Sequence, residues 1–207
     1  MKKFPSKFFN SASTYAKEYF KEISQVSKLI NLEEIEKASL ILKKNYMNRK
    51  KVFVCGNGGS SAISNHFLCD HMKGISLKTK IFPRIISLSS NIEIISAISN
   101  DISFDDIFVF QLSSLADKDD CLITISSSGN SKNIIKSIEW AKKNDLTTIS
   151  LNGFNGGKAS RLSEININVP SKNYGIVEDI HQSIMHILAH TIRMQFMSKN
   201  DLKKSIF

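Results

Sequence analysis

Cysteine, proline and tryptophan are all scarce in this sequence. Its 207 residues include three cysteines, three prolines and one tryptophan. Two of the three cysteines, Cys55 and Cys121, lie in apolar runs typical of buried strands, so no structural disulfide is expected. A chain of this length buries roughly 70% of its unfolded surface, so it can form a core without a disulfide or metal staple.

Long apolar runs are also missing. No stretch approaches the roughly 20 residues of a membrane span, and the N-terminal residues lack the apolar centre of a signal peptide. We therefore expect a cytoplasmic protein without a membrane partner. A hydrophobic content of 42% is too high for intrinsic disorder.

Positive charge is in excess. The chain has 28 Lys and Arg residues against 19 Asp and Glu residues, a formal net charge of +9. The lysines are spread along the chain, and no nucleic-acid-binding module is recognisable. We expect no nucleic-acid partner, and the net charge at most enriches anionic small molecules around the protein.

Residues 1–50 are expected to form two amphipathic helices. Apolar side chains recur at three- and four-residue steps from Tyr15 to Ile30 and again from Leu32 to Leu42. Asn31 is placed to cap the second helix, with Glu34 at its third position.

From residue 51 the pattern changes to short apolar runs separated by helical stretches, which is typical of a parallel sheet covered on both faces. The expected strands are residues 52–55, 84–88, 121–125, 147–151 and 167–169. A last helix is expected from about Val177 to Met197, with its isoleucines at 180, 184, 187 and 192 and its leucine at 188 directed toward the core. The sequence thus predicts one α/β domain over residues 1–207, in which a doubly wound five-stranded parallel sheet in residues 51–199 follows the helical extension of residues 1–50.

A glycine-rich loop follows the first expected strand. Gly56, Gly58 and Gly59 surround Asn57, and Ser60 then opens a helix. Such a loop lets backbone N–H groups and a helix N-terminus approach an anion. Its spacing matches neither the dinucleotide fingerprint nor the P-loop, so nucleotide binding is not supported. The alternative is a turn that only connects strand to helix.

A serine-rich loop follows the third expected strand and also precedes a helix. Its hydroxyls belong to Ser126, Ser127, Ser128 and Ser131. Hydroxyls at a helix N-terminus suit a phosphate monoester, and the alternative is a polar loop with a capping residue. In a doubly wound sheet both loops lie beyond the carboxyl ends of the strands, where ligands bind.

The five histidines fall into two segments. His66 and His71 lie on the helix after the glycine-rich loop, and the other three, at 181, 186 and 190, lie on the last helix. His66 and Asp70 are four residues apart, hence on one helix face. Such a pair can bind a divalent metal or divide proton transfers, and the alternative is a hydrogen-bonded surface pair.

The motifs together resemble the sugar isomerase (SIS) family, whose fold is flavodoxin-like. The resemblance rests on CGNGGS, the SND at residues 99–101, SSSGNS, the NGFNGG that begins at Asn152, and the VP before a histidine-bearing last helix. The order and spacing are similar to those of the sedoheptulose 7-phosphate isomerases, which begin heptose synthesis for bacterial surface polysaccharides.

This resemblance implies a zinc-binding homotetramer with active sites at subunit boundaries. The implied zinc ligands are His66, Asp70, Glu178 and His186, and Asp70 and His186 are the implied acid/base pair. The residues implied to bind the sugar phosphate are Asn57, Gly58, Gly59, Ser60, Asn100, Asp101, Ser126, Ser127, Ser128, Ser131 and Glu178.

Two positions depart from the isomerase pattern. Asp70 stands where these isomerases carry Glu, and Glu178 stands where they carry Gln. The changes could compensate each other, indicate a different sugar phosphate, or indicate loss of catalysis. The alternative function is a non-catalytic SIS protein that binds a phosphosugar or regulates replication through DnaA.

Overall fold

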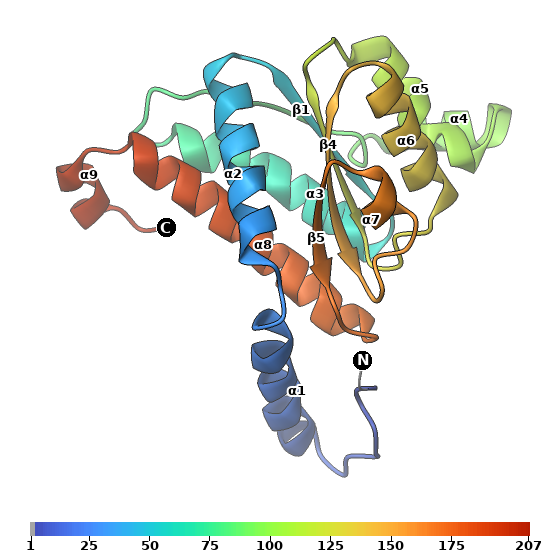
Figure 1. The fold of residues 1–207 in the computed structure, drawn as a ribbon, viewed down its shortest axis with the longest axis vertical. Coiled ribbons are helices and arrows are strands. Elements are labelled where there is room, and N and C mark those ends of the chain that lie inside the picture. The colour runs from blue at the N-terminus through green and yellow to red at the C-terminus, as the bar shows by residue number, and fades with distance from the viewer. Residues whose placement is uncertain (1–2) are drawn as a thin grey trace.

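The computed structural model describes residues 3–207, which form a five-stranded sheet with helices on both faces (Figure 1). The strands are β1 (Lys51–Gly56), β2 (Arg84–Ser87), β3 (Cys121–Ser126), β4 (Thr147–Gly153) and β5 (Ile165–Val169). The α-helices are α1 (Ala12–Ser27), α2 (Leu32–Met47), α3 (Gly59–Cys69), α4 (Ile92–Asp101), α5 (Ile107–Leu115), α6 (Lys132–Lys143), α7 (Ala159–Leu162), α8 (Tyr174–Phe196) and α9 (Lys199–Lys204). A π-helix, η1 (Asp70–Gly74), continues α3, and a 3₁₀ turn, η2 (Phe104–Asp106), precedes α5.

All neighbouring strands pair in parallel, in the order β2-β1-β3-β4-β5. The chain winds outward from β1 to β2 and then crosses to β3 on the other side of β1. Ligands bind beside such a reversal, at the carboxyl ends of the two central strands. Because Gly56 of β1 pairs with Ile125 of β3, the loops after these strands leave the sheet side by side.

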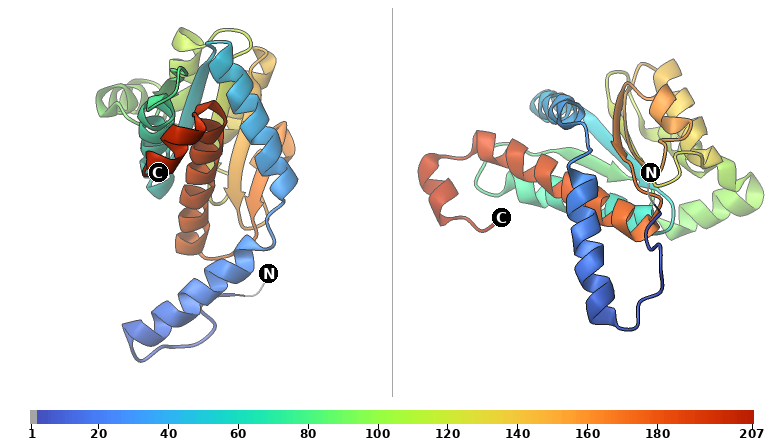
Figure 2. Two further views of the ribbon diagram at one scale, coloured as in Figure 1. Left: turned by 90° about the vertical axis from the view of Figure 1, so that its left-hand side faces the viewer. Right: turned by 60° about the horizontal axis from the view of Figure 1, so that its bottom comes forward.

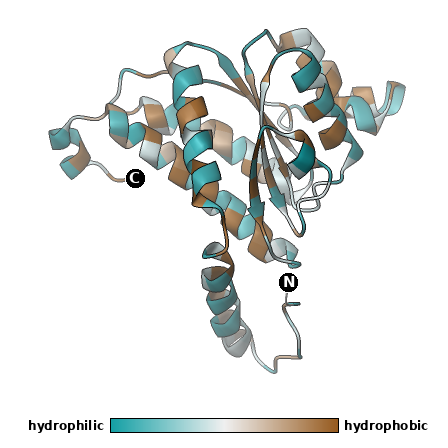
Figure 3. Cartoon of the chain, in the orientation of Figure 1, coloured by the Kyte–Doolittle hydropathy of each residue, from teal (hydrophilic) through white to brown (hydrophobic). Residues whose placement is uncertain are grey.

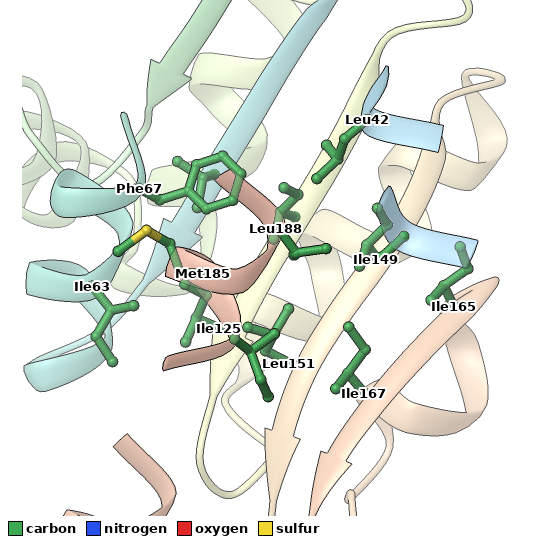
Figure 4. Packing of buried hydrophobic residues seen from close by; sticks show 14 of the residues in the cluster. Leu42, Ile63, Phe67, Ile125, Ile149, Leu151, Ile165, Ile167, Met185 and Leu188 are labelled. Atoms are coloured by element: carbon green, nitrogen blue, oxygen red, sulfur yellow. The ribbon is translucent and has the colours of Figure 1, made fainter. Parts of the chain in front are cut away.

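Alternate residues of the strands build two separate cores. In β1, Val52 and Val54 face α2, α3 and α8, whereas Phe53 and Cys55 face α5 and α6. Figure 4 shows the first core, with side chains from α2, α3, α8 and the strands packed together. Along the helices, apolar residues gather toward the sheet and polar ones toward solvent (Figure 3). The doubly wound α/β prediction is confirmed.

The N-terminal helices are also confirmed. The Asn31 side chain accepts a hydrogen bond from the backbone N–H of Glu33 and caps α2, which packs on the sheet through Leu42. Helix α1 extends away from the α/β body (Figures 1 and 2), and it contacts α8 through the hydroxyl of Tyr19, which donates to Asp179 at 2.7 Å.

Several predicted boundaries and one core assignment differ from the structure. Helix α1 ends at Ser27, before the predicted Ile30, and α8 begins at Tyr174 because the Asn173 side chain caps it by accepting from the N–H of Ile176. Ile187 was expected in the core but is 45% exposed. The buried stripe of α8 runs through the adjacent pairs at 176/177, 180/181, 184/185, 188/189 and 192/193, and Ile187 lies outside it.

Candidate functional site

The glycine-rich loop turns sharply from β1 into α3. Gly58 has φ +54°, a left-handed conformation that glycine adopts readily. The N–H of Ser60 donates to the carbonyl of Asn57 at 3.0 Å, which starts the helix directly after the turn. The loop therefore brings the N-terminus of α3 close to the end of the strand, as the sequence predicted.

The serine-rich loop makes the equivalent turn from β3 into α6. Ser131 is the N-cap of α6, yet its hydroxyl forms no capping bond among the described residues, contrary to the capping alternative. Ser127 is only 5% exposed, and its hydroxyl has no hydrogen-bond partner in residues 3–207. A buried hydroxyl without a partner is costly, and because Ser127 also lines the hollow between the two loops, a ligand bound there would supply the missing bond.

The two loops are joined by a pair of amides. Asn57 Nδ2 donates to Asn133 Oδ1 at 2.9 Å, and Asn133 Nδ2 donates to Asn57 Oδ1 at 3.0 Å. Between the loops lies a hollow of about 290 Å³, lined by Asn57, Gly58, Gly59, Ser60, Ile125, Ser126, Ser127, Ser128, Ser131, Tyr174 and Glu178. It contains eight of the predicted sugar-phosphate residues together with Glu178. Asn133 was missed, because a single asparagine inside a helix carries no recognisable signal.

Glu178 closes this hollow from the first turns of α8. A Cβ at Gly59 would lie 2.6 Å from Glu178 Oε2, so glycine at position 59 makes room for the carboxylate. Desolvation raises the pKa of Glu178 above its usual value, and the neighbouring charge of Asp179 adds to this shift. The structure thus places Glu178 beside the glycine-rich loop.

A second cluster lies farther along the same two helices. His66 Nε2 is 3.4 Å from Asp70 Oδ1, and His186 Nε2 is 3.3 Å from Asp70 Oδ2. Burial lowers the pKa of His186, while the charge of Asp70 acts in the opposite direction. The structure thus brings together three residues that the resemblance implied, and their roles stay predictions. Glu178 is outside the group of His, Cys, Asp and Glu side chains that lie within 4.8 Å of one another here, so its role as a metal ligand stays a prediction.

The three side chains offer the types of ligand atom that zinc prefers. Zinc favours imidazole nitrogen and carboxylate oxygen in tetrahedral geometry with bonds of about 2.0–2.1 Å, which places neighbouring ligand atoms about 3.3 Å apart. His66 Nε2 and His186 Nε2 lie 3.4 Å and 3.3 Å from Asp70, each from a different carboxylate oxygen, and one ligand atom from each of the three residues lies within 4.8 Å of the others.

Tyr46 and His71 form a buried polar pair next to this cluster. The Tyr46 hydroxyl is 2.7 Å from His71 Nδ1, and His71 Nε2 lies 3.4 Å from the carbonyl oxygen of Met185. Burial lowers the pKa of His71 to about 3, so the ring is neutral. The pair connects α2, η1 and α8 beside Asp70 and His186. No role was predicted for His71, because its partner Tyr46 is 25 residues away in the sequence.

Asn100 and Asp101 are not among the residues that line the hollow. They lie at the end of α4, where Asn100 Nδ2 donates to Asp101 Oδ1 at 2.8 Å. Asp101 instead borders an apolar hollow of about 380 Å³ between α4 and α5. Their role in substrate binding remains a prediction.

The other histidines lie around these features. His181 is fully buried, and its Nε2 is 3.0 Å from the carbonyl oxygen of Asn152. His190 stacks on His186 with ring centroids 5.9 Å apart.

Cys55 and Cys121 are buried, and burial raises the pKa of the Cys55 thiol to about 12, which agrees with a packing role. None of the helices in residues 3–207 is long and apolar enough to cross a membrane.

Comparisons with known proteins agree with this arrangement. The sequence profile of the SIS domain family matches residues 14–153. A phosphoheptose isomerase of Helicobacter pylori is 38% identical over 173 residues, covering 83% of this chain and 90% of that protein. One of Buchnera aphidicola is 37% identical over 193 residues, covering 93% and 95%.

A solved structure of similar shape is the phosphoheptose isomerase GmhA of Neisseria gonorrhoeae. It superposes with a TM-score of 0.80 at 27% identity and covers 88% of this chain and 98% of its own. The family match and the two relatives each extend over more than half of the sequence, through both loops. The chain therefore belongs to the SIS domain family and, within it, to the phosphoheptose isomerase group.

Proposed function

We propose that the protein is an aldose-ketose isomerase that converts sedoheptulose 7-phosphate to D-glycero-D-manno-heptose 7-phosphate for lipopolysaccharide or capsule synthesis. The observation that carries the proposal is the buried Ser127 hydroxyl, which has no partner among the described residues and lies in a hollow between two helix N-termini. The names of the relatives support the heptose substrate.

Phosphate binding is assigned to the hydroxyls of the serine-rich loop. Ser126, Ser127, Ser128 and Ser131 all line the hollow, and α6 directs its positive end toward it. No lysine or arginine lines this hollow within the described residues. The phosphate would thus be held by neutral donors, with the net positive charge as a background attraction.

Proton transfer is assigned to Asp70 and His186. Isomerisation moves one proton from C1 to C2 of the sugar and another from O1 to O2. The Asp70 carboxylate would take the proton from C1 and return it to C2, leaving an enediolate in between. The His186 imidazole would take the proton of O1 and deliver it to O2, since burial favours its neutral form. The 3.3 Å between His186 Nε2 and Asp70 Oδ2 lets both groups act on adjacent atoms.

We also propose that His66, Asp70 and His186 can hold one zinc ion, with Glu178 as the predicted fourth ligand. Bound zinc would supply a Lewis acid for the sugar oxygens. His186 Nε2 cannot hold a proton and a metal ion at once, so rates measured with zinc and with a chelator distinguish its two roles.

The test is incubation of the purified protein with sedoheptulose 7-phosphate, with and without added zinc, followed by detection of the aldose. We expect turnover in the wild type and a loss of at least roughly 100-fold in Asp70→Asn, which removes the base and keeps the shape. Phosphosugar binding without aldose under either condition would instead indicate the regulatory alternative, above all if Asp70→Glu with Glu178→Gln restored nothing.

We further propose that residues 1–207 act as one SIS unit and assemble into a homotetramer. Helix α1 extends from the body, and Ile94, Ile102, Phe110 and Leu115 expose apolar surface around the hollow of α4 and α5. A second copy seated there would cover this surface and could place Asn100 and Asp101 at a neighbouring site. Native mass spectrometry tests this, because a tetramer has four times the 23.3 kDa of one chain.

A further inference from the structure

Gln182 lies between the two histidines of the proposed metal centre. It is on α8, one turn before His186, and is half-buried. Its Nε2 is 2.8 Å from His66 Nδ1 and 3.2 Å from His186 Nε2. Gln182 had no predicted role and is outside the predicted ligand set.

Gln182 contacts Nδ1 of His66, the ring nitrogen that does not face the Asp70 carboxylate. His66 turns Nε2 toward Asp70 and Nδ1 toward Gln182. In the metal-free ring, the amide N–H of Gln182 donates to a bare Nδ1, which places the imidazole proton on Nε2. The ring is therefore held in one orientation and one tautomer.

The same side chain suits the metal-bound ring. When a metal ion takes the lone pair of Nε2, a neutral imidazole carries its proton on Nδ1, and that N–H needs an acceptor. Turning the Gln182 amide by 180° exchanges its nitrogen and oxygen with little change of shape, so that Oε1 faces His66. Glutamine can do this because it carries both a donor and an acceptor.

We propose that Gln182 is a positioning residue of the metal centre: its amide holds Nδ1 of His66 and so keeps Nε2 turned toward Asp70. This inference rests on the metal centre described under the proposed function. Glu178 is one turn earlier on α8 and its carboxylate lies beside Gly59, whereas the Gln182 amide contacts the His66 ring.

The test measures zinc affinity by competition with a chromophoric chelator. Outer partners of metal-bound histidines typically contribute 10- to 100-fold in affinity, so we expect losses of about that size in Gln182→Ala and Gln182→Met. Methionine keeps the length and removes the amide. Gln182→Glu keeps an acceptor for the Nδ1 proton and should bind zinc at least as tightly as the wild type. Gln195→Ala, an exposed glutamine farther along α8, is the matched control and should bind as the wild type does.

Cobalt(II) in place of zinc gives a second readout. If Gln182 acts on His66 from outside the ligand shell, the visible bands of the cobalt form keep their energies in Gln182→Met while the affinity falls. A shift of the bands would make Gln182 a ligand itself and overturn the positioning role. Thermal unfolding without metal shows that each variant is folded.

The outcomes separate this inference from the proposed metal centre. If the wild type binds zinc and Gln182→Ala and Gln182→Met bind it equally well, the inference is wrong and the centre stands. If the wild type binds no zinc, the centre is wrong and the inference is wrong with it, whereas isomerase activity measured with a chelator is a separate result.

Discussion

Asn57 and Asn133 exchange two hydrogen bonds across the point where the sheet reverses its strand order, and they join the glycine-rich loop to the first turn of α6. Asn133 is 1% exposed, and its Oδ1 also accepts from the N–H of Ile134. The hollow between the loops is lined by the same residues that these amides hold in place. The spacing of the anion site therefore depends on a contact between segments 76 residues apart.

Replacing Asn133 by alanine should loosen both loops. Removal of one partner leaves the Asn57 amide without its bonds, so we expect a loss of about 1–3 kcal/mol in the free energy of unfolding by urea. We also expect a higher KM for the sugar phosphate. Asn200→Ala, at an exposed asparagine of α9, is the control. An Asn133→Ala protein with wild-type stability and KM would show that the amide pair does not hold the loops.

Ser127→Ala should affect ligand binding and not folding. The hydroxyl has no partner in the described residues, so its removal should leave the free energy of unfolding unchanged or slightly higher. A hydrogen bond to a charged group contributes about 1.5–3 kcal/mol, so the Kd for inorganic phosphate should rise roughly ten- to hundredfold. Calorimetric titration measures it.

The matched control for Ser127→Ala is Ser163→Ala. Ser163 also has a buried hydroxyl without a partner in the described residues, and it lies beside β5, outside the loop hollow. Its substitution should leave phosphate binding unchanged. Equal effects of the two variants on phosphate binding would contradict the assignment of Ser127 to the anion site.

Glu178→Gln should strengthen binding of inorganic phosphate. The Glu178 carboxylate lines the same hollow as the serine hydroxyls, and two negative charges about 4 Å apart in water repel by about 1 kcal/mol, or roughly fivefold in Kd. Because desolvation raises the pKa of Glu178, the effect should grow as the pH rises, so the titrations are compared over a pH series. Glu139→Gln, on the exposed face of α6, serves as the control. Weaker binding in Glu178→Gln would mean that the carboxylate itself contributes to the site.

His181 should make the protein sensitive to acid. Burial lowers its pKa from the usual 6.5 to about 4, so the folded protein keeps it neutral while the unfolded chain protonates it. The unfolded state then binds more protons, and stability falls as the pH drops from 6.5 toward 4. One such group contributes up to about 1.4 kcal/mol per pH unit in this window. Urea unfolding of His181→Gln should show a correspondingly shallower pH dependence over this range, and an unchanged slope would contradict the neutral, buried ring.

Local sequence patterns predict much of the fold. Short apolar runs such as residues 121–125 predict strands, and the glycines and serines that follow β1 and β3 mark the two anion loops. These signals are local because φ, ψ and helix capping depend on near neighbours. Ile187 shows the limit, since an apolar residue within a helical pattern can still face solvent.

The sequence by itself determined the α/β order and both loops, and its resemblance to the SIS family singled out His66, Asp70 and His186. Only the tertiary structure decided that Asn133 joins the loops, that Glu178 lies beside Gly59, and that Gln182 stands between two histidines. Gln182 and His66 are 116 residues apart, and their contact exists because α3 and α8 pack together on one face of the sheet. Such contacts depend on how complete helices pack, and no local pattern of residues encodes the partner that each polar side chain meets.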